Sequence, residues 1–184
     1  MRPLADAALL AQLRAGGLVI YFRHTATDFS RDDRTMRDFD DCDSQRPLTA
    51  KVRTDATAIG AHFKRLAIPV GRVLASPYCR TREVAERMFG RYERADAVRG
   101  GPADASGERY AGLKTLLSTP PAAGTNLVIS SHANPMRAVA GPPYLAEGEA
   151  VVIRPLGQSG FEIIARIPLE QWGSYPAPRE RQRP

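Results

Sequence analysis

Two histidines in this sequence stand where a catalytic site could form. Arg23 and His24 directly follow the apolar run 18–22, and His132 comes soon after the apolar run 127–129. Both runs are short and rich in β-branched or aromatic residues, which is typical of a buried strand in a parallel sheet. Open α/β sheets place their chemistry just beyond the carboxyl ends of their strands, so we expect both histidines at one site.

The residue types favour chemistry on phosphorus. A neutral imidazole is a good nucleophile near neutral pH, because its pKa lies close by. A phosphoryl group in transfer spreads negative charge over its oxygens, and fixed cationic or hydrogen-bonding groups must meet that charge. Arg23, Arg80 and His132 could do so. Each feature alone also has a structural explanation, because Arg23 could pair with a carboxylate and His24 could be a hydrogen-bonded core residue. His62 lies in a helical pattern, and we interpret it as structural.

Two further segments complete a pattern around these histidines. The segment 76–80, Ser-Pro-Tyr-Cys-Arg, follows another short apolar run, and the segment 46–49, Arg-Pro-Leu-Thr, precedes a helical pattern. Together with Arg23-His24 and His132, these segments resemble, in order and spacing, the signatures of the histidine phosphatase superfamily, whose fold is called phosphoglycerate mutase-like. The resemblance covers most of the chain. The long insertions of the mutases are absent, which favours a small single-domain phosphatase.

The resemblance implies a metal-independent phosphomonoester hydrolase without a cofactor. His24 would attack and become a phosphohistidine, a general acid would protonate the departing alkoxide, and water would then free phosphate. Thr25 stands where the family has glycine, and it could tighten the pocket or add a hydroxyl contact. Asn134 could touch phosphate or only cap a helix. The residues expected to bind the phosphate are Arg23, Thr25, Arg80, His132 and Asn134.

The general acid remains open among several acidic residues. Many family members use a glutamate in the connection before the third strand, and Glu108 is the best positional match. Glu149, with Glu147 beside it, follows the second histidine and is the next candidate. Asp28, close behind the nucleophile, is a further candidate. We rank Glu108 first and Glu149 second as catalytic residues.

Two other functions stay open. The chain could be a mutase-type phosphotransferase acting on a sugar acid, or a catalytically weak family member that binds a phosphorylated ligand. The substrate would be a phosphorylated small molecule or a phosphoprotein. The long polar stretch 25–46 would act as a lid and determine which substrate is accepted. Because this stretch carries charges of both signs, it does not indicate either substrate class. The aspartates within 38–43 are interpreted as a solvated or substrate-facing loop.

The order of apolar and helical patterns predicts an α/β fold. We expect a three-layer α/β/α sandwich with a mostly parallel sheet, formed as one domain over residues 1–175 with a flexible tail over 176–184. Ser130 and Ser131 are interpreted as loop residues, and 90–107 as an irregular connection. The expected strands are 18–22, 73–75, 127–130, 151–153 and 161–167. The expected helices are an amphipathic opening helix within 1–17, one capped by Thr49 over about 50–66, 79–89, 108–117 and a short one starting at 134.

Composition limits the partners and leaves the compartment open. The chain of 184 residues has a formal net charge of +6, but its arginines are scattered, so we expect no nucleic-acid partner. No apolar stretch approaches membrane-spanning length, so we expect no membrane partner. Cys42 and Cys79 are either two unlinked thiols or, in an oxidising compartment, a disulfide. We expect a cytoplasmic protein as the sequence stands, and a periplasmic or exported one if a signal segment was trimmed. The oligomeric state is not predicted.

Overall fold

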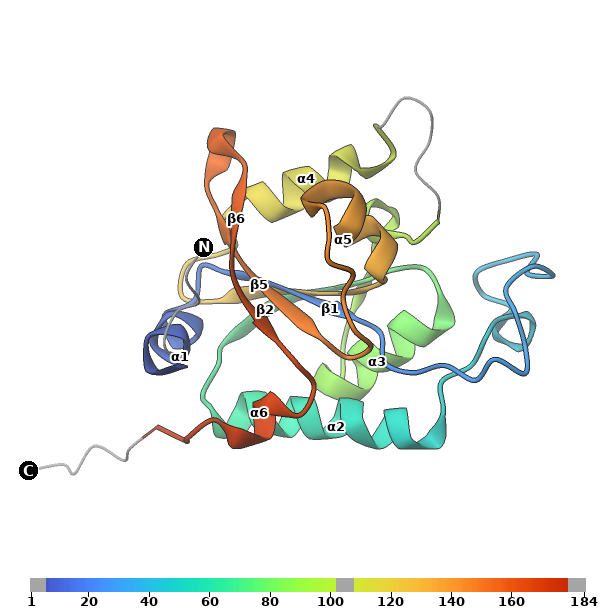
Figure 1. The fold of residues 1–184 in the computed structure, drawn as a ribbon, viewed down its shortest axis with the longest axis horizontal. Helices are drawn as coiled ribbons and strands as arrows, with labels where there is room; N and C mark the ends of the chain where they lie inside the picture. Colours follow the sequence, from blue (N-terminus) through green and yellow to red (C-terminus); the bar gives the residue numbers. More distant parts are fainter. Residues whose placement is uncertain (1–5, 102–107, 179–184) are drawn as a thin grey trace, which may run out of the picture.

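The computed structural model describes residues 6–101 and 108–178 of the chain. At its centre lies a six-stranded sheet with the strand order β3-β2-β4-β1-β5-β6 (Figure 1). Neighbours from β3 to β1 pair in parallel, whereas β5 pairs antiparallel with both β1 and β6. The strands are β1 Val19–Arg23, β2 Val70–Ala75, β3 Glu93–Arg94, β4 Asn126–Ser131, β5 Ala150–Pro155 and β6 Phe161–Ile167.

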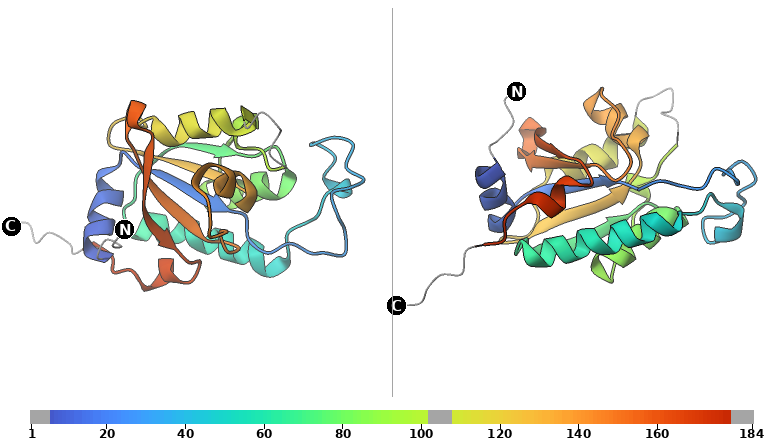
Figure 2. Two further views of the ribbon diagram at one scale, coloured as in Figure 1. Left: turned by 45° about the horizontal axis from the view of Figure 1, so that its top comes forward. Right: turned by 60° about the horizontal axis from the view of Figure 1, so that its bottom comes forward.

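Helices cover both faces of the sheet, which confirms the predicted three-layer α/β/α fold (Figures 1 and 2). One face packs against α1 Asp6–Ala15, α2 Ala50–Arg65, α3 Cys79–Phe89 and α6 Gln171–Ser174. The other face packs against α4 Ala111–Ser118 and α5 Ala133–Ala140. Short 3-10 helices lie at Cys42–Ser44, Asp96–Val98, Glu108–Tyr110 and Gly157–Ser159. No helix among the described residues is long and apolar enough to cross a membrane.

Strand β1 shows why the sheet needs two covering layers. Successive side chains of a strand point to opposite faces. Ile20 and Phe22 therefore join the core under α2 and α3, while Val19 and Tyr21 join the core under α4 and α5. All four side chains are buried. A continuous apolar run rather than an alternating one follows from burial on both faces, as the sequence pattern indicated.

The amino ends of three strands are joined by one buried side chain. The Asn126 Nδ2 atom donates to the carbonyl oxygens of Leu13, at 2.7 Å, and Pro69, at 2.9 Å. Its Oδ1 atom accepts a hydrogen bond from the Leu18 backbone N–H at 3.2 Å. The end of α1, the start of β1 and the segment before β2 are thereby tied to β4. This junction lies at the opposite end of the strands from His24 and His132.

The structure corrects several local expectations. The interpretation of Ser130 and Ser131 as loop residues is wrong, and the expected strand 127–130, which included Ser130, extends to Ser131. Both side chains are buried at the end of β4, where their hydroxyls donate to the carbonyls of Thr81 and Val98. The connection expected after residue 90 contains β3 and a 3-10 helix, and α5 begins at Ala133 rather than at residue 134. The opening helix is seen from Asp6, and its residues 1–5 lie outside the described part, as do 179–184 of the expected tail.

A long segment leaves β1 at the carboxyl edge of the sheet and returns at α2 (Figure 2). It is tied back by a disulfide between Cys42 and Cys79, which is one of the two alternatives that the sequence left open. The buried Gln45 side chain adds a second tie, because its Oε1 atom accepts from the Cys79 backbone N–H at 2.9 Å. The predicted cap of α2 is also present, since the Thr49 side chain accepts from the Val52 backbone N–H. The segment is therefore anchored at the first turn of α3.

Candidate active site

A cavity of about 380 Å³ lies beyond the carboxyl ends of β1, β2 and β4. Parallel pairing places these three strand ends side by side, because Arg23 is in register with Ser131 and Ala75 with Ser130. The segments that follow the strands form the walls. The lining residues are Arg23, His24, Asp33, Arg46, Tyr78, Arg80, Gly100, Gly101, His132, Ala133, Asn134 and Tyr144.

The two predicted histidines meet in this cavity. The ring centroids of His24 and His132 are 5.2 Å apart, and the rings meet edge to face. Only 4% of His24 and 5% of His132 is exposed. Both side chains stand one residue beyond neighbouring strands, so the register of the sheet alone brings them together. The structure thus places the two predicted histidines side by side in one cavity, while their chemical roles stay predictions.

His24 keeps one ring nitrogen unprotonated. Its Nδ1 atom lies 2.8 Å from the Thr25 carbonyl oxygen. A carbonyl oxygen can only accept, so Nδ1 carries the proton and Nε2 keeps its lone pair. Burial, and then the positive charge of Arg80, lower the pKa of His24 from 6.5 to about 3. The imidazole is therefore neutral near pH 7, which is the state that a histidine nucleophile would need.

His132 is held from three directions. The Tyr21 hydroxyl donates to its backbone carbonyl oxygen at 2.7 Å, and the Ser76 hydroxyl lies 2.8 Å from its Nε2 atom. Gly100 packs against the ring so closely that a Cβ atom there would stand 2.6 Å from the His132 Cδ2 atom. Burial, followed by the neighbouring His24, lowers the pKa of His132 well below its usual value. The ring is thus fixed in one orientation and uncharged.

Three arginines supply positive charge to the cavity. Arg80, in the first turn of α3, is 5% exposed and pairs with Asp33 at 2.9 Å. The guanidinium of Arg23 donates to the Leu145 carbonyl oxygen at 2.6 Å and lies 3.4 Å from a Glu147 carboxylate oxygen. The Nε–H groups of Arg46 and Arg80 are buried without a hydrogen-bond partner. Buried donors without partners are costly, so this cavity is suited to an anion that would satisfy them.

Asp33 is a cavity residue that the sequence analysis missed. Its Oδ1 atom accepts from the Arg80 Nη1 atom and, at 3.0 Å, from the Arg46 backbone N–H. It is the one carboxylate among the described residues that line this cavity. No local pattern marks it among the many aspartates of the 25–49 segment. Its place depends on the long-range ties at Gln45 and the disulfide.

The structure does not bring Glu108 or Glu149 to the cavity. Glu149 accepts from the Ala146 backbone N–H and pairs with Arg166 at 2.7 Å, so its carboxylate binds the loop before β5 to β6. Glu108 starts the 3-10 helix Glu108–Tyr110 and is exposed. Neither side chain lines the cavity.

Of the remaining residues expected at the site, only Asn134 lines the described part of the cavity. Asp28 is exposed and accepts from the Ser30 backbone N–H, and Glu147 lies behind Arg23. Thr25 is buried behind His24, where its hydroxyl has no partner, and it does not line the cavity. Asn134 does line the cavity, inside α5 rather than at its N-cap, and its side-chain amide donates to the Gly101 carbonyl oxygen.

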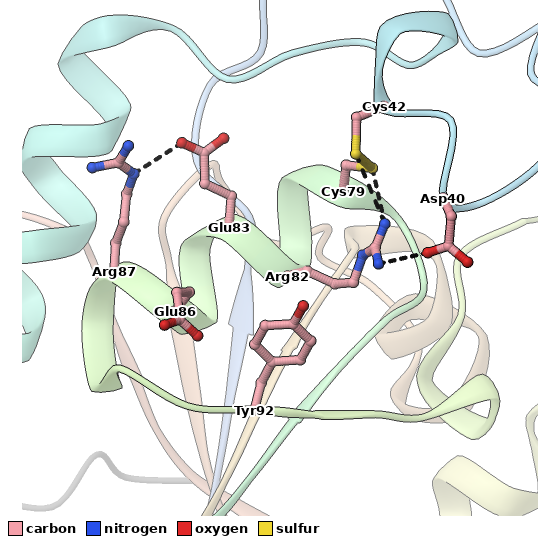
Figure 3. Close-up of a pocket in the computed structure, with 8 residues that line it drawn as sticks. All are labelled: Asp40, Cys42, Cys79, Arg82, Glu83, Glu86, Arg87 and Tyr92. Atoms are coloured by element: carbon pink, nitrogen blue, oxygen red, sulfur yellow. Dashed lines mark hydrogen bonds and ion pairs between the residues drawn. A yellow bond between two sulfur atoms is a disulfide. The ribbon is translucent and has the colours of Figure 1, made fainter.

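A second hollow borders the disulfide (Figure 3). It measures about 640 Å³ and is formed mainly by α3 side chains, including Arg82 and Glu86, with Tyr92 and the disulfide. Although larger, it holds none of the three histidines, and we do not place the chemistry there. No group of three His, Cys, Asp or Glu side chains within 6–101 and 108–178 is arranged to hold a metal ion.

Comparisons with known proteins identify the fold. No protein-family model matches the sequence, and no curated protein matches it. Solved structures do match. A candidate phosphohistidine phosphatase, SixA from Agrobacterium tumefaciens, is 16% identical with a TM-score of 0.57, covering 83% of this chain and 98% of its own. A mycobacterial glucosyl-3-phosphoglycerate phosphatase is 13% identical with a TM-score of 0.58, covering 80% of this chain and 97% of its own. The protein histidine phosphatase SixA complexed with tungstate is 17% identical with a TM-score of 0.55, covering 83% and 97%. The chain therefore shares the fold of these solved structures, which is the predicted phosphoglycerate mutase-like fold.

Proposed function

We propose that this protein is a histidine phosphatase that hydrolyses a phosphomonoester through a phosphohistidine at His24, without a metal ion. The observation that carries the proposal is the pair of neutral, buried imidazoles, His24 and His132, in a cavity lined by three arginines. The His24 imidazole is uncharged, and the positive charges on the described part of the wall come from guanidinium groups. A phosphate group fits this combination, because bidentate arginine contacts match its oxygens.

Each residue of the cavity has a separate role in the proposed reaction. The phosphate binds between Arg23, Arg80 and Arg46, and the unpartnered Nε–H groups of Arg80 and Arg46 donate hydrogen bonds to its oxygens. The His24 Nε2 atom, kept unprotonated by the Nδ1 hydrogen bond to Thr25, attacks phosphorus. His132, oriented by Ser76 and Gly100, contributes hydrogen bonding to the phosphoryl oxygens during transfer. Water then attacks the phosphohistidine and releases inorganic phosphate.

The fold supports a phosphorylated substrate, but it is compatible with both a phosphoprotein and a small phosphorylated molecule. The neighbours include proteins described as phosphohistidine phosphatases and one described as acting on a glucosyl phosphoglycerate. We propose that this chain likewise takes a phosphorylated protein or a small phosphorylated metabolite. A cavity of about 380 Å³ admits a phosphate and a few neighbouring atoms, with the rest of the substrate at the mouth beside Tyr144.

The test is hydrolysis of phenyl phosphate with a chelator present, comparing the wild type with His24→Ala. Activity in the wild type that the chelator leaves unchanged, and that His24→Ala abolishes, supports the proposal. His62→Ala is the matched control, because His62 lies on α2 away from the cavity and should leave turnover unchanged. Phosphate binding without turnover over a panel of esters would instead favour a binding protein. Isomerisation of a phosphorylated sugar acid faster than its hydrolysis would favour a mutase.

We also propose that the protein works in an oxidising compartment. The support is the Cys42–Cys79 disulfide, because such bonds persist mainly outside the reducing cytosol. The test is alkylation of free thiols in freshly lysed source cells, followed by the intact mass. Two unmodified cysteines support the proposal. Two alkylated cysteines would place the working protein in a reducing compartment.

A further inference from the structure

A histidine phosphatase needs an acid for its leaving group, and none of the carboxylates suggested by the sequence lines the cavity. Glu149 is tied to Arg166, and Glu147 lies behind Arg23. Asp28 and Glu108 are exposed outside the cavity wall. Asp33 is the carboxylate that the described wall does contain. We propose that Asp33 is the general acid of this enzyme, an assignment that rests on the function proposed above.

The position of Asp33 suits the leaving-group side of the reaction. His24 lies deep in the cavity at 4% exposure, whereas 25% of the Asp33 side chain is exposed. Attack from His24 must occur in line with departure of the ester oxygen. The substrate beyond that oxygen has to extend toward solvent, and Asp33 is the more exposed of these two residues on the wall of the same cavity. Its carboxylate therefore borders the path that the leaving oxygen takes.

Asp33 is also held in place, as a catalytic group must be. The Arg46 backbone N–H and the Arg80 guanidinium both donate to its Oδ1 atom. The segment that carries it is closed at its base by a bridge between Thr27 and Leu48 and tied to α3 by the disulfide. Without substrate, hydrogen bonds and the nearby arginines keep the pKa of Asp33 below its usual value despite partial burial, so it rests as a carboxylate.

Substrate binding changes the surroundings of Asp33. A phosphate at Arg80 competes with the carboxylate for the same guanidinium and adds negative charge beside it. Both effects favour the protonated carboxyl group, which takes its proton from solvent or from the phosphate monoanion. The carboxylate seen at Arg80 is the resting state of the acid. Catalytic groups of this kind commonly change protonation between the free and bound enzyme.

The proposed reaction has two displacement steps at phosphorus. The His24 Nε2 atom forms a bond to phosphorus while the ester P–O bond breaks. The electron pair of that bond stays on the ester oxygen, which takes the proton from Asp33. Water then attacks the phosphohistidine, gives its proton to the Asp33 carboxylate and displaces Nε2. Asp33 is thereby protonated again, and one ester and one water become one alcohol and one phosphate.

The test compares two esters that differ in their need for an acid. Dinitrophenyl phosphate has a leaving group that departs without a proton, whereas phenyl phosphate does not. In Asp33→Asn, kcat/KM for phenyl phosphate should fall by about 100-fold or more, and kcat/KM for dinitrophenyl phosphate by only a few fold. The kcat/KM value reports only the steps up to formation of the phosphoenzyme, so it isolates the proton transfer to the leaving group. Asp33→Glu, which keeps an acid, should recover part of the phenyl phosphate activity.

Asp32→Asn is the matched control, because the neighbouring Asp32 is exposed and pairs only with Arg34. It should behave as the wild type on both esters. An equal loss on both esters in Asp33→Asn would mean that Asp33 positions Arg80, and would overturn the proposal. A gain in activity together with tighter inhibition by inorganic phosphate would also overturn it, because Asp33 would then be a competitor for Arg80. A wild type inactive on both esters would instead refute the phosphatase function itself.

Discussion

At the scale of single residues, the site depends on how closely the backbone approaches His132. A Cβ atom at residue 100 would stand 2.6 Å from the ring, so Gly100→Ala must push the ring away from its hydrogen bond with Ser76. We expect kcat/KM for aryl phosphates to fall by about 100-fold, because small misplacements at a reacting centre are costly. Gly173→Ala is the control, since its Cβ atom would make only ordinary contacts near His62. Wild-type activity in Gly100→Ala would show that the ring position does not matter.

The neutral state of His24 gives a prediction for stability against pH. Its pKa is lowered from 6.5 to about 3 in the folded protein, mainly by burial. Between these values the unfolded state binds more protons, so stability rises with pH and is lost on acidification through this window. From pH 7 to pH 5, His24 should account for a loss of roughly 2 kcal/mol in the free energy of unfolding. Urea unfolding should therefore depend less on pH in His24→Gln than in the wild type. Equal pH dependence would mean that His24 has the same pKa in the folded and the unfolded protein.

At the scale of elements, the disulfide fixes the segment between β1 and α2. It closes a chain segment with a sequence separation of 37, for which loop-closure entropy predicts a contribution of about 4 kcal/mol. Replacing both Cys42 and Cys79 with serine should lower the free energy of unfolding toward that amount. It should also lower activity, because Asp33 and Arg46 lose their anchor. Reductant should affect the wild type and not the double variant. Equal sensitivity of both proteins to reductant would contradict the account.

The junction at Asn126 should affect stability without affecting chemistry. Asn126→Ala leaves the Leu18 N–H without its acceptor and removes a donor from Leu13 and Pro69, all at the opposite end of the sheet from the cavity. Such losses predict destabilisation of roughly 2–4 kcal/mol. The kcat value of the folded variant should match the wild type. A large fall in kcat with unchanged stability would show that the two ends of the sheet are coupled.

At the scale of the whole molecule, the net positive charge should increase the rate at which an anionic substrate binds. The chain has a net charge of +6, and its cavity carries three arginines against one aspartate. An anionic substrate is attracted to such a surface, and salt screens that attraction. The kcat/KM value for an aryl phosphate should fall several-fold as potassium chloride rises from low to physiological concentrations and beyond. A value independent of salt would mean that the charges are balanced locally, as Asp33 balances Arg80.

The sequence predicted the parts of the molecule that local patterns control. Apolar runs located the main strands, and register then placed His24 beside His132. It could not place Asp33, because that side chain reaches Arg80 only through the fold of a long polar segment, its disulfide and the Gln45 tie. The same limit applies to Glu149, whose partner Arg166 lies on another strand. The two-residue strand β3 has too few residues to leave a periodic pattern. Long-range contacts therefore determine where the acidic residue of the cavity lies, whereas local patterns are enough to locate its two histidines.

The most direct measurement is detection of a phosphoryl group on His24. The protein is mixed with an aryl phosphate, quenched within milliseconds in alkali, digested and analysed by mass spectrometry. Alkali preserves phosphohistidine, so we predict a phosphorylated peptide containing His24 that loses its phosphate in acid. It should be absent from His24→Ala and present in His62→Ala. Turnover without any such peptide, or a phosphoryl group on another residue, would contradict the mechanism.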